Sequence, residues 1–172
     1  MQKSIAGLNS VMRTYSKLIY SLAYSRTQNH ADAEDIFQEV FLRLAQRAEP
    51  FQSEEHCKAW LIRVTANLST NVIASAWRRH VILREYLPEH RNIPAADEEP
   101  SEIDYVMRQL AEKDRMVLYL RYYEGMSSEE IAKDLDESLS AVRRRISRAK
   151  KKLGTLLSEA EKEDKRDVWE QA

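Results

Sequence analysis

The sequence predicts an all-α protein made of two small helical bundles, the second a helix-turn-helix, joined by a flexible acidic linker. Three observations predict this class. Apolar residues recur three and four positions apart along most of the chain, which is the period of an amphipathic helix. Glycine and proline are scarce, with 3 and 4 residues among 172, a composition that favours helices over hairpins. An acidic stretch that holds three of the prolines divides the apolar pattern into two parts.

The first bundle is expected within residues 1–84. A helix over residues 5–26 should carry one broad apolar face and end at a polar break. A second helix is expected over residues 32–48. It opens with Asp32 and Asp35, whose negative charges suit the N-terminal end of a helix dipole.

A loop over residues 51–57 should follow, because Pro50 ends the second helix. The third helix is expected from about residue 58 to residue 79. Its expected buried stripe is Trp60, Leu61, Val64, Leu68, Val72 and Ile73. The polar and basic residues on its other faces could hydrogen-bond and stack on unpaired bases.

The remainder divides into a linker over residues 85–100, a second bundle over residues 101–158 and an acidic tail over residues 159–172. The linker prediction depends on proline content and acidic charge. Within the second bundle, one helix should surround Val106 and another should end at Gly125. The tail has few apolar residues and is expected to fray.

Residues 127–153 are the most informative stretch of the chain. Ser127 and Glu130 have the spacing of a capping box, which starts a short helix. A break at residues 136–138 can form a turn, and Ser138 or Ser140 can cap the helix that follows. The apolar positions of this helix are Leu139, Val142, Ile146, Ala149 and Leu153.

The second helix of this pair is strongly basic and has no acidic residue between Ser140 and Leu153. Its cations are Arg143, Arg144, Arg145, Arg148, Lys150, Lys151 and Lys152. A lone basic helix could simply expose a solvated face. A short capped helix and a three-residue turn precede this one, so the pattern favours a recognition helix that lies in the DNA major groove.

Composition limits the other possibilities. The single cysteine, Cys57, excludes an internal disulfide framework and a multi-cysteine zinc site, and neither a metal nor a cofactor is expected. No signal peptide is visible, and no stretch approaches the ~20 apolar residues of a membrane span, so we expect a cytoplasmic protein without direct membrane insertion. The net charge of −1 is low for a protein that binds DNA unaided, which suggests that a partner supplies part of the affinity.

Four stretches together resemble one family, the extracytoplasmic-function (ECF) group of bacterial sigma factors. They are DAEDIFQEVFLRL at residues 32–44, WLIRVTAN at 60–67, LAEKDRMVLYLRYYEGMSSEEIA at 110–132 and AVRRRISRAKKKL at 141–153. Their order matches that of the family, and the linker falls between the second and the third. The resemblance covers nearly the full length.

The resemblance implies a partner for each bundle. The first bundle would bind the clamp coiled coil of core RNA polymerase and the promoter −10 element. The second would bind the −35 element and the polymerase flap. An anti-sigma factor, soluble or membrane-bound, would be a further partner.

The resemblance also implies site residues. For polymerase they are Asp35, Gln38, Glu39 and Leu42. For the −10 element they are Phe51, Gln52 and Ser53 in the loop, then Arg63, Asn67, Asn71, Arg78 and Arg79 on the third helix. For the −35 element they are Ser140, Arg143, Arg144, Arg145, Arg148 and Lys151.

Several positions depart from the family pattern. Asn71 stands where many members have Asp, and Ala74 and Ser75 replace a frequent arginine pair. Asp136 replaces a common turn glycine, which Asp can do because it tolerates a left-handed conformation.

Two other classes of function compete with this interpretation. A free-standing helix-turn-helix regulator would bind DNA without polymerase and would not need the motifs of the first bundle. An enzyme is disfavoured because the four histidines are dispersed and the sequence has no HExxH, P-loop, Rossmann or GxSxG pattern. His56 and Cys57 are adjacent, but a loop histidine beside a semi-buried thiol explains them better than a nucleophile does.

Overall fold

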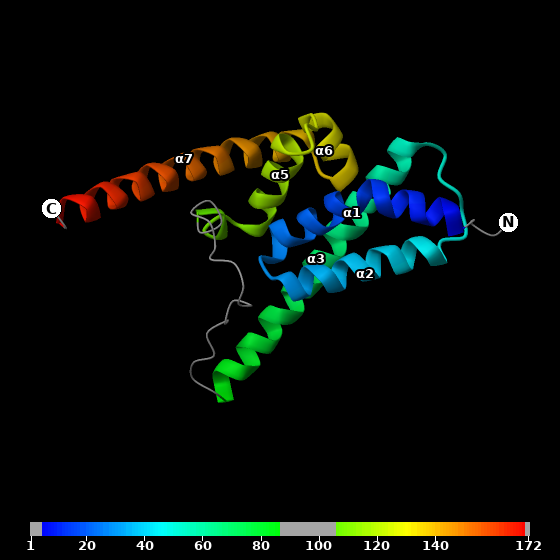
Figure 1. The fold of residues 1–172 in the computed structure, drawn as a ribbon, viewed down its shortest axis with the longest axis horizontal. Helices are drawn as coiled ribbons and strands as arrows, with labels where there is room; N and C mark the ends of the chain where they lie inside the picture. The colour runs from blue at the N-terminus through cyan, green and yellow to red at the C-terminus, as the bar shows by residue number, and fades with distance from the viewer. Residues whose placement is uncertain (1–4, 87–105, 171–172) are drawn as a thin grey trace. The chain divides into compact units, whose positions relative to one another are not determined.

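The computed structural model describes residues 5–86 and 106–170 of the chain. Every regular element in those two ranges is an α-helix, as the sequence predicted. The chain divides into two compact units, one built on α1, α2 and α3 and the other on α5, α6 and α7 (Figure 1). Within the described ranges, each helix is too short or too polar to cross a membrane.

The first unit is a three-helix bundle of α1 (Ile5–Thr27), α2 (His30–Gln46) and α3 (Glu54–Tyr86). Each helix packs against the other two. Gln28 has a φ of 51°, which turns the chain sharply between α1 and α2. Asn29 then caps α2, because its side-chain oxygen accepts a hydrogen bond from the Asp32 N–H at 3.0 Å.

The core of this unit is aliphatic. Large side chains with almost no exposed surface come from all three helices: Ile19, Leu22, Ile36, Val40, Leu44, Leu61 and Ile62. The predicted apolar face of α1 is therefore confirmed. Burial of these side chains supplies the main stabilisation of the bundle, at about 1.5–3 kcal/mol for each large apolar side chain.

The buried face of α3 differs from the predicted stripe. Trp60, Val64, Val72 and Ile73 are only half-buried, whereas Thr65 and Ser69 are buried. These two hydroxyls donate hydrogen bonds to carbonyl oxygens one turn earlier, at 2.7 and 2.8 Å. Because the helix backbone satisfies them, the two polar side chains can lie in the core at little cost.

The second unit contains α5 (Glu112–Tyr122), α6 (Ser128–Leu135) and α7 (Leu139–Glu170). Gly125 has a φ of 67° and ends α5 as predicted. Helix α5 packs on α7. The buried side chains of this unit include Val106, Leu110, Val117, Leu120, Ile131, Val142 and Ala149.

Helix boundaries differ from the predictions in two places. Helix α3 begins at Glu54 rather than near residue 58, so only the first part of the expected loop is a loop. Helix α7 continues through the predicted acidic tail to Glu170, where fraying was expected. The predicted linker lies outside the described residues, apart from the two residues that end α3.

Candidate nucleic-acid interface

The start of the helix-turn-helix is the predicted capping box. The Ser127 N–H donates to a Glu130 carboxylate oxygen at 2.7 Å, and the Glu130 N–H donates to the Ser127 hydroxyl at 3.1 Å. These two bonds satisfy donors that a helix N-terminus otherwise leaves unpaired. They fix where α6 begins.

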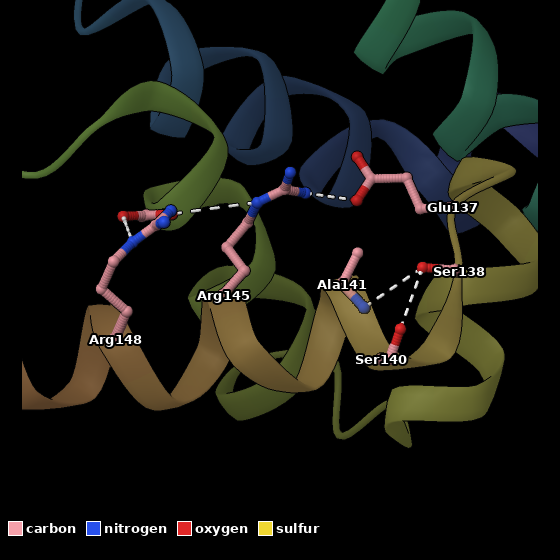
Figure 2. A network of polar contacts seen from close by, with 7 residues as sticks. Glu137, Ser138, Ser140, Ala141, Arg145 and Arg148 are labelled. Carbon is pink, nitrogen blue, oxygen red and sulfur yellow. Dashed lines mark hydrogen bonds and ion pairs between the residues drawn. The ribbon is translucent and has the colours of Figure 1, made fainter.

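The turn between α6 and α7 has the predicted left-handed residue. Asp136 has a φ of 56°, a conformation that Asp adopts more readily than most other non-glycine residues. Ser138 then caps α7, since its hydroxyl accepts a hydrogen bond from the Ala141 N–H at 3.2 Å (Figure 2). Of the two predicted caps, Ser138 therefore has this role, and the Ser140 hydroxyl lies 3.3 Å from the Ser138 hydroxyl.

Helix α7 packs through the predicted apolar stripe. Val142 and Ala149 are buried, and Ile146 and Leu153 are half-buried. The exposed faces therefore carry most of the basic residues. Arg144 and Lys151 are exposed, and neither forms an ion pair with another side chain that the structure describes.

Arg143 is exposed but has a partner on α6. Its guanidinium contacts the Glu129 carboxylate, which is also exposed. The pKa of Glu129 is lowered, mainly because its carboxylate accepts a hydrogen bond from the backbone N–H of Glu129 itself. The contact with Arg143 lowers this pKa further, by a smaller amount. Exposed pairs of this kind are weak, so DNA can compete for Arg143.

Arg145 and Arg148 both reach toward a buried carboxylate, Asp114 of α5. Arg148 donates from Nη2 to Asp114 Oδ1 at 2.8 Å and from Nε to Oδ2 at 3.4 Å. Arg145 lies farther from it, with 3.9 Å between Nε and Oδ1, and hydrogen-bonds to Glu137 in the turn. The Arg145 side chain is only 17% exposed, so its geometry favours bracing the turn, while its predicted DNA contact stays a prediction.

Two lysines of α7 also contact the protein itself. The Lys150 ammonium lies 5.9 Å from the ring centroid of Tyr122, a cation–π distance. Lys152 donates to the Gln109 carbonyl at 2.6 Å. The basic face is therefore partly turned back onto α5 and the segment before it.

In the first unit, the residues predicted to bind polymerase lie along one face of α2. Asp35 and Gln38 are exposed, and the large apolar side chain of Leu42 is 52% exposed. Glu39 is half-buried and pairs with Arg43, with 2.7 Å between the carboxylate and Nε. The four side chains thus form a strip that the core does not use.

The loop before α3 is built around a small aromatic cluster. The Arg47 guanidinium lies 4.6 Å from the ring centroid of Phe51 and 5.6 Å from that of Trp60. The Phe51 and Trp60 centroids are 5.6 Å apart. This packing holds Phe51 half-buried, whereas Gln52 and Ser53 are exposed.

Ser53 caps α3, because its hydroxyl accepts a hydrogen bond from the His56 N–H at 3.1 Å. It also hydrogen-bonds to Glu55 and thereby lowers the pKa of that carboxyl. On α3, Arg63, Asn67 and Asn71 are exposed at intervals of four residues, so they follow one side of the helix. Arg78 and Arg79 continue the helix backbone, but their side chains lie outside the described part of the structure.

Comparison with known families matches both units. Residues 11–79 match the family described as Sigma-70 region 2, and residues 101–153 match the family described as Sigma-70, region 4. The chain belongs to the ECF group of the sigma-70 family. The second family match contains the whole helix-turn-helix, and the first contains the α2 strip and the loop before α3.

Curated relatives in the family carry matching names. The ECF RNA polymerase sigma factor SigE of Mycolicibacterium smegmatis is 32% identical over 168 residues, which cover 91% of this chain and 64% of that protein. The probable RNA polymerase sigma factor RfaY of Xanthomonas campestris is 32% identical over 77% of this chain and 36% of its own length. The chain thus spans less than two thirds of these two relatives. The ECF RNA polymerase sigma-E factor of Escherichia coli is 27% identical over 83% of this chain and 82% of that protein.

Solved structures support the same fold. The sigma factor RpoE of Bartonella quintana, in a complex with the anti-sigma factor NepR, matches with a TM-score of 0.71 and 19% identity. That match covers 90% of this chain and 98% of the other. CnrH, in a complex with the cytosolic domain of CnrY, matches with a TM-score of 0.62 and 22% identity over 91% of this chain and 90% of the other.

Sequence reasoning about this ECF family member missed the carboxylate partners of the basic helix. Asp114 is in the first turn of α5, where acidic residues usually face solvent and favour the helix dipole. A signal was nevertheless present, because buried Leu110, Val117 and Leu118 lie three or four residues away on the same face. Arg47, which packs on Phe51, gave no comparable signal.

Proposed function

We propose that the chain is a non-catalytic ECF-type sigma factor that binds core RNA polymerase and directs it to specific promoters. The observation that carries the proposal is the presence of two features in one chain. One is a helix-turn-helix with a capped, basic α7, and the other is a separate region 2 bundle with an unused strip on α2. A free-standing regulator would need only the first feature.

The α2 strip is the proposed polymerase surface. Asp35, Gln38 and Leu42 are exposed together, so the strip combines a charge, an amide and an apolar side chain. Interface centres commonly have this composition of an apolar contact surrounded by polar groups. We assign this strip to the clamp coiled coil of polymerase on the family resemblance.

The promoter contacts are divided between the two units. The loop residues Phe51, Gln52 and Ser53, with the exposed row on α3, are proposed to bind the −10 element. The N-terminal part of α7, above all exposed Arg144, is proposed to read the −35 element, because recognition helices contact base edges through their first turns. Lys151 is proposed to neutralise a phosphate, which adds affinity without sequence discrimination.

An anti-sigma factor is a proposed further partner. The two structural neighbours described above are sigma factors in complexes with the anti-sigma factor NepR or with the cytosolic domain of CnrY. Polymerase and promoter DNA are both cytoplasmic in bacteria, so the proposed function places the chain in the cytoplasm.

The first test compares promoter binding with and without polymerase. We expect a gel shift and run-off transcription only when the purified chain and core polymerase are both present. Equally tight promoter binding by the chain alone would instead indicate a free-standing regulator.

The polymerase surface is tested with Asp35→Lys. The change reverses one exposed charge in the strip, so core binding should weaken by about tenfold or more while the unfolding free energy changes by less than about 0.5 kcal/mol. Glu159→Lys on α7 is the matched control, since it makes the same charge change at an exposed site outside the strip. Equal core binding by the two variants would contradict the assignment.

A further inference from the structure

Asp114 carries a buried negative charge and pairs with two arginines of the basic helix, Arg145 and Arg148. Its side chain is 5% exposed, and it lies in the first turn of α5. Burying a carboxylate costs several kcal/mol unless it is paired and hydrogen-bonded. Arg148 meets that requirement with two contacts, at 2.8 and 3.4 Å.

The same contacts restrict Arg148. Asp114 uses Nε and one N–H of Nη2, which form one edge of the planar guanidinium. A guanidinium has five N–H donors, so its outer edge keeps two parallel donors for a bidentate contact, one N–H of Nη1 and the second N–H of Nη2. The Arg148 side chain is 68% exposed, which leaves that edge accessible. Its hydrogen bonds to Asp114 also raise the pKa of Arg148 above its ordinary value.

We propose that Asp114 is a positioning residue for promoter recognition, which holds Arg148 so that its outer edge makes a directional contact with the −35 element. The inference rests on the proposed role of α7 as the recognition helix. A long cation that rotates freely can donate to any phosphate and so adds affinity for every sequence. A guanidinium fixed before binding has already lost that freedom, and it favours the DNA whose acceptors match its orientation.

Arg145 has a different role in this network, which provides a control. Its shorter contact is to Glu137, at the end of the turn, and its side chain is 17% exposed. Glu137 and Asp114 are therefore two carboxylates of one network, but only Asp114 contacts the exposed arginine.

The experiment uses the holoenzyme, formed from the full chain and core polymerase. A −35 element is first selected from a randomised library with the wild-type holoenzyme, and affinity is then measured on that promoter and on one with a scrambled −35 element. For Asp114→Asn we expect the ratio of the two affinities to fall about fivefold or more, the lower end of what one arginine–guanine pair contributes. Affinity for the scrambled promoter should stay the same or rise, because a freed arginine still attracts phosphates.

Glu137→Gln is the matched control, since it removes one carboxylate from the same network without touching Arg148. We expect it to lower stability and to leave the affinity ratio within about twofold of wild type. If Asp114→Asn leaves the ratio of the two affinities unchanged, the proposal is wrong. Equal losses of both affinities would show that Asp114 has only a structural role.

A second variant, Arg148→Lys, decides the question if Asp114→Asn does not fold. Lysine keeps the charge at this exposed position but cannot form the planar fork. We expect the affinity ratio to fall about as far as in Asp114→Asn, and an unchanged ratio would contradict the proposal. Failure of the wild-type holoenzyme to select any −35 element would instead contradict the proposed function itself.

Discussion

At the residue scale, Tyr15 shows how burial couples the first unit to pH. Its ring is buried in the core, and its hydroxyl donates to a Glu54 carboxylate oxygen at 3.1 Å. Burial first, and then Glu54, raise the pKa of Tyr15 to about 12. Folding therefore favours the protonated phenol, whose pKa in the unfolded chain is about 10. The stabilisation is fully present below pH 10 and is lost as the pH rises toward 12.

Substitution of Tyr15 by Phe tests this coupling. At pH 9 the variant should be less stable by about 1 kcal/mol, because it lacks the hydrogen bond to Glu54. Between pH 10 and 12 the wild type should lose about 2–3 kcal/mol more than the variant does, so the difference should close or reverse. Urea unfolding followed by helical circular dichroism at several pH values measures it. A difference that stays constant from pH 9 to 12 would contradict the coupling.

Single residues could be predicted from sequence where the cause is local. The Ser127 cap and the left-handed Asp136 depend only on their neighbours in the chain, and both predictions are confirmed. The contact of Arg148 with Asp114 instead depends on the packing of α5 against α7, because the two residues are 34 positions apart in the chain. The pattern of a basic helix therefore predicted which cations exist but could not separate those that face outward from those that brace the fold.

At the element scale, helix identity was predictable and helix extent was not. Apolar periodicity located each helix, because burial of one face drives both the pattern and the packing. The start of α3 was misplaced because Ser53, rather than a later residue, provides the cap. The buried face of α3 was misjudged because hydroxyls satisfied by the preceding turn behave as small core residues.

The capping box of α6 gives a prediction at this scale. Ser127→Ala removes the acceptor for the Glu130 N–H, and losses of this kind cost about 1 kcal/mol. We expect the second unit to lose that much stability in thermal or urea unfolding. The −35 affinity of the holoenzyme should fall with it, because Glu129 of α6 pairs with Arg143 near the start of α7.

Ser128→Ala is the control for this prediction. The same substitution at the adjacent residue leaves both capping bonds in place, so its effect should stay within about 0.5 kcal/mol. Equal losses in the two variants would show that the capping box does not determine the stability of α6.

For the whole molecule, the charge distribution and the division into two units bear on why the units are covalently connected. The net charge is −1, with 27 basic and 28 acidic residues, so the chain as a whole has little attraction for DNA. A run of seven cations with no acidic residue among them instead lies in residues 140–153 of α7, in one unit, while the proposed polymerase surface is on α2, in the other. Each unit also has its own buried cluster of apolar side chains. Covalent connection of the two units should therefore matter more to function than to folding.

Separate fragments 1–86 and 101–172 test that consequence. Because each has its own core, each should be helical and unfold cooperatively by itself.

In a run-off assay with core polymerase, the two fragments mixed at equal concentration should support far less −35-dependent transcription than the intact chain. A tether makes the second contact intramolecular, and avidity gains of this kind reach about 10²–10⁴. The control is the intact chain at the same concentration on a promoter with a scrambled −35 element. There the intact chain should lose its advantage in transcription over the mixed fragments. Full activity of the mixture, or failure of either fragment to fold, would contradict this view of two self-contained units joined for function.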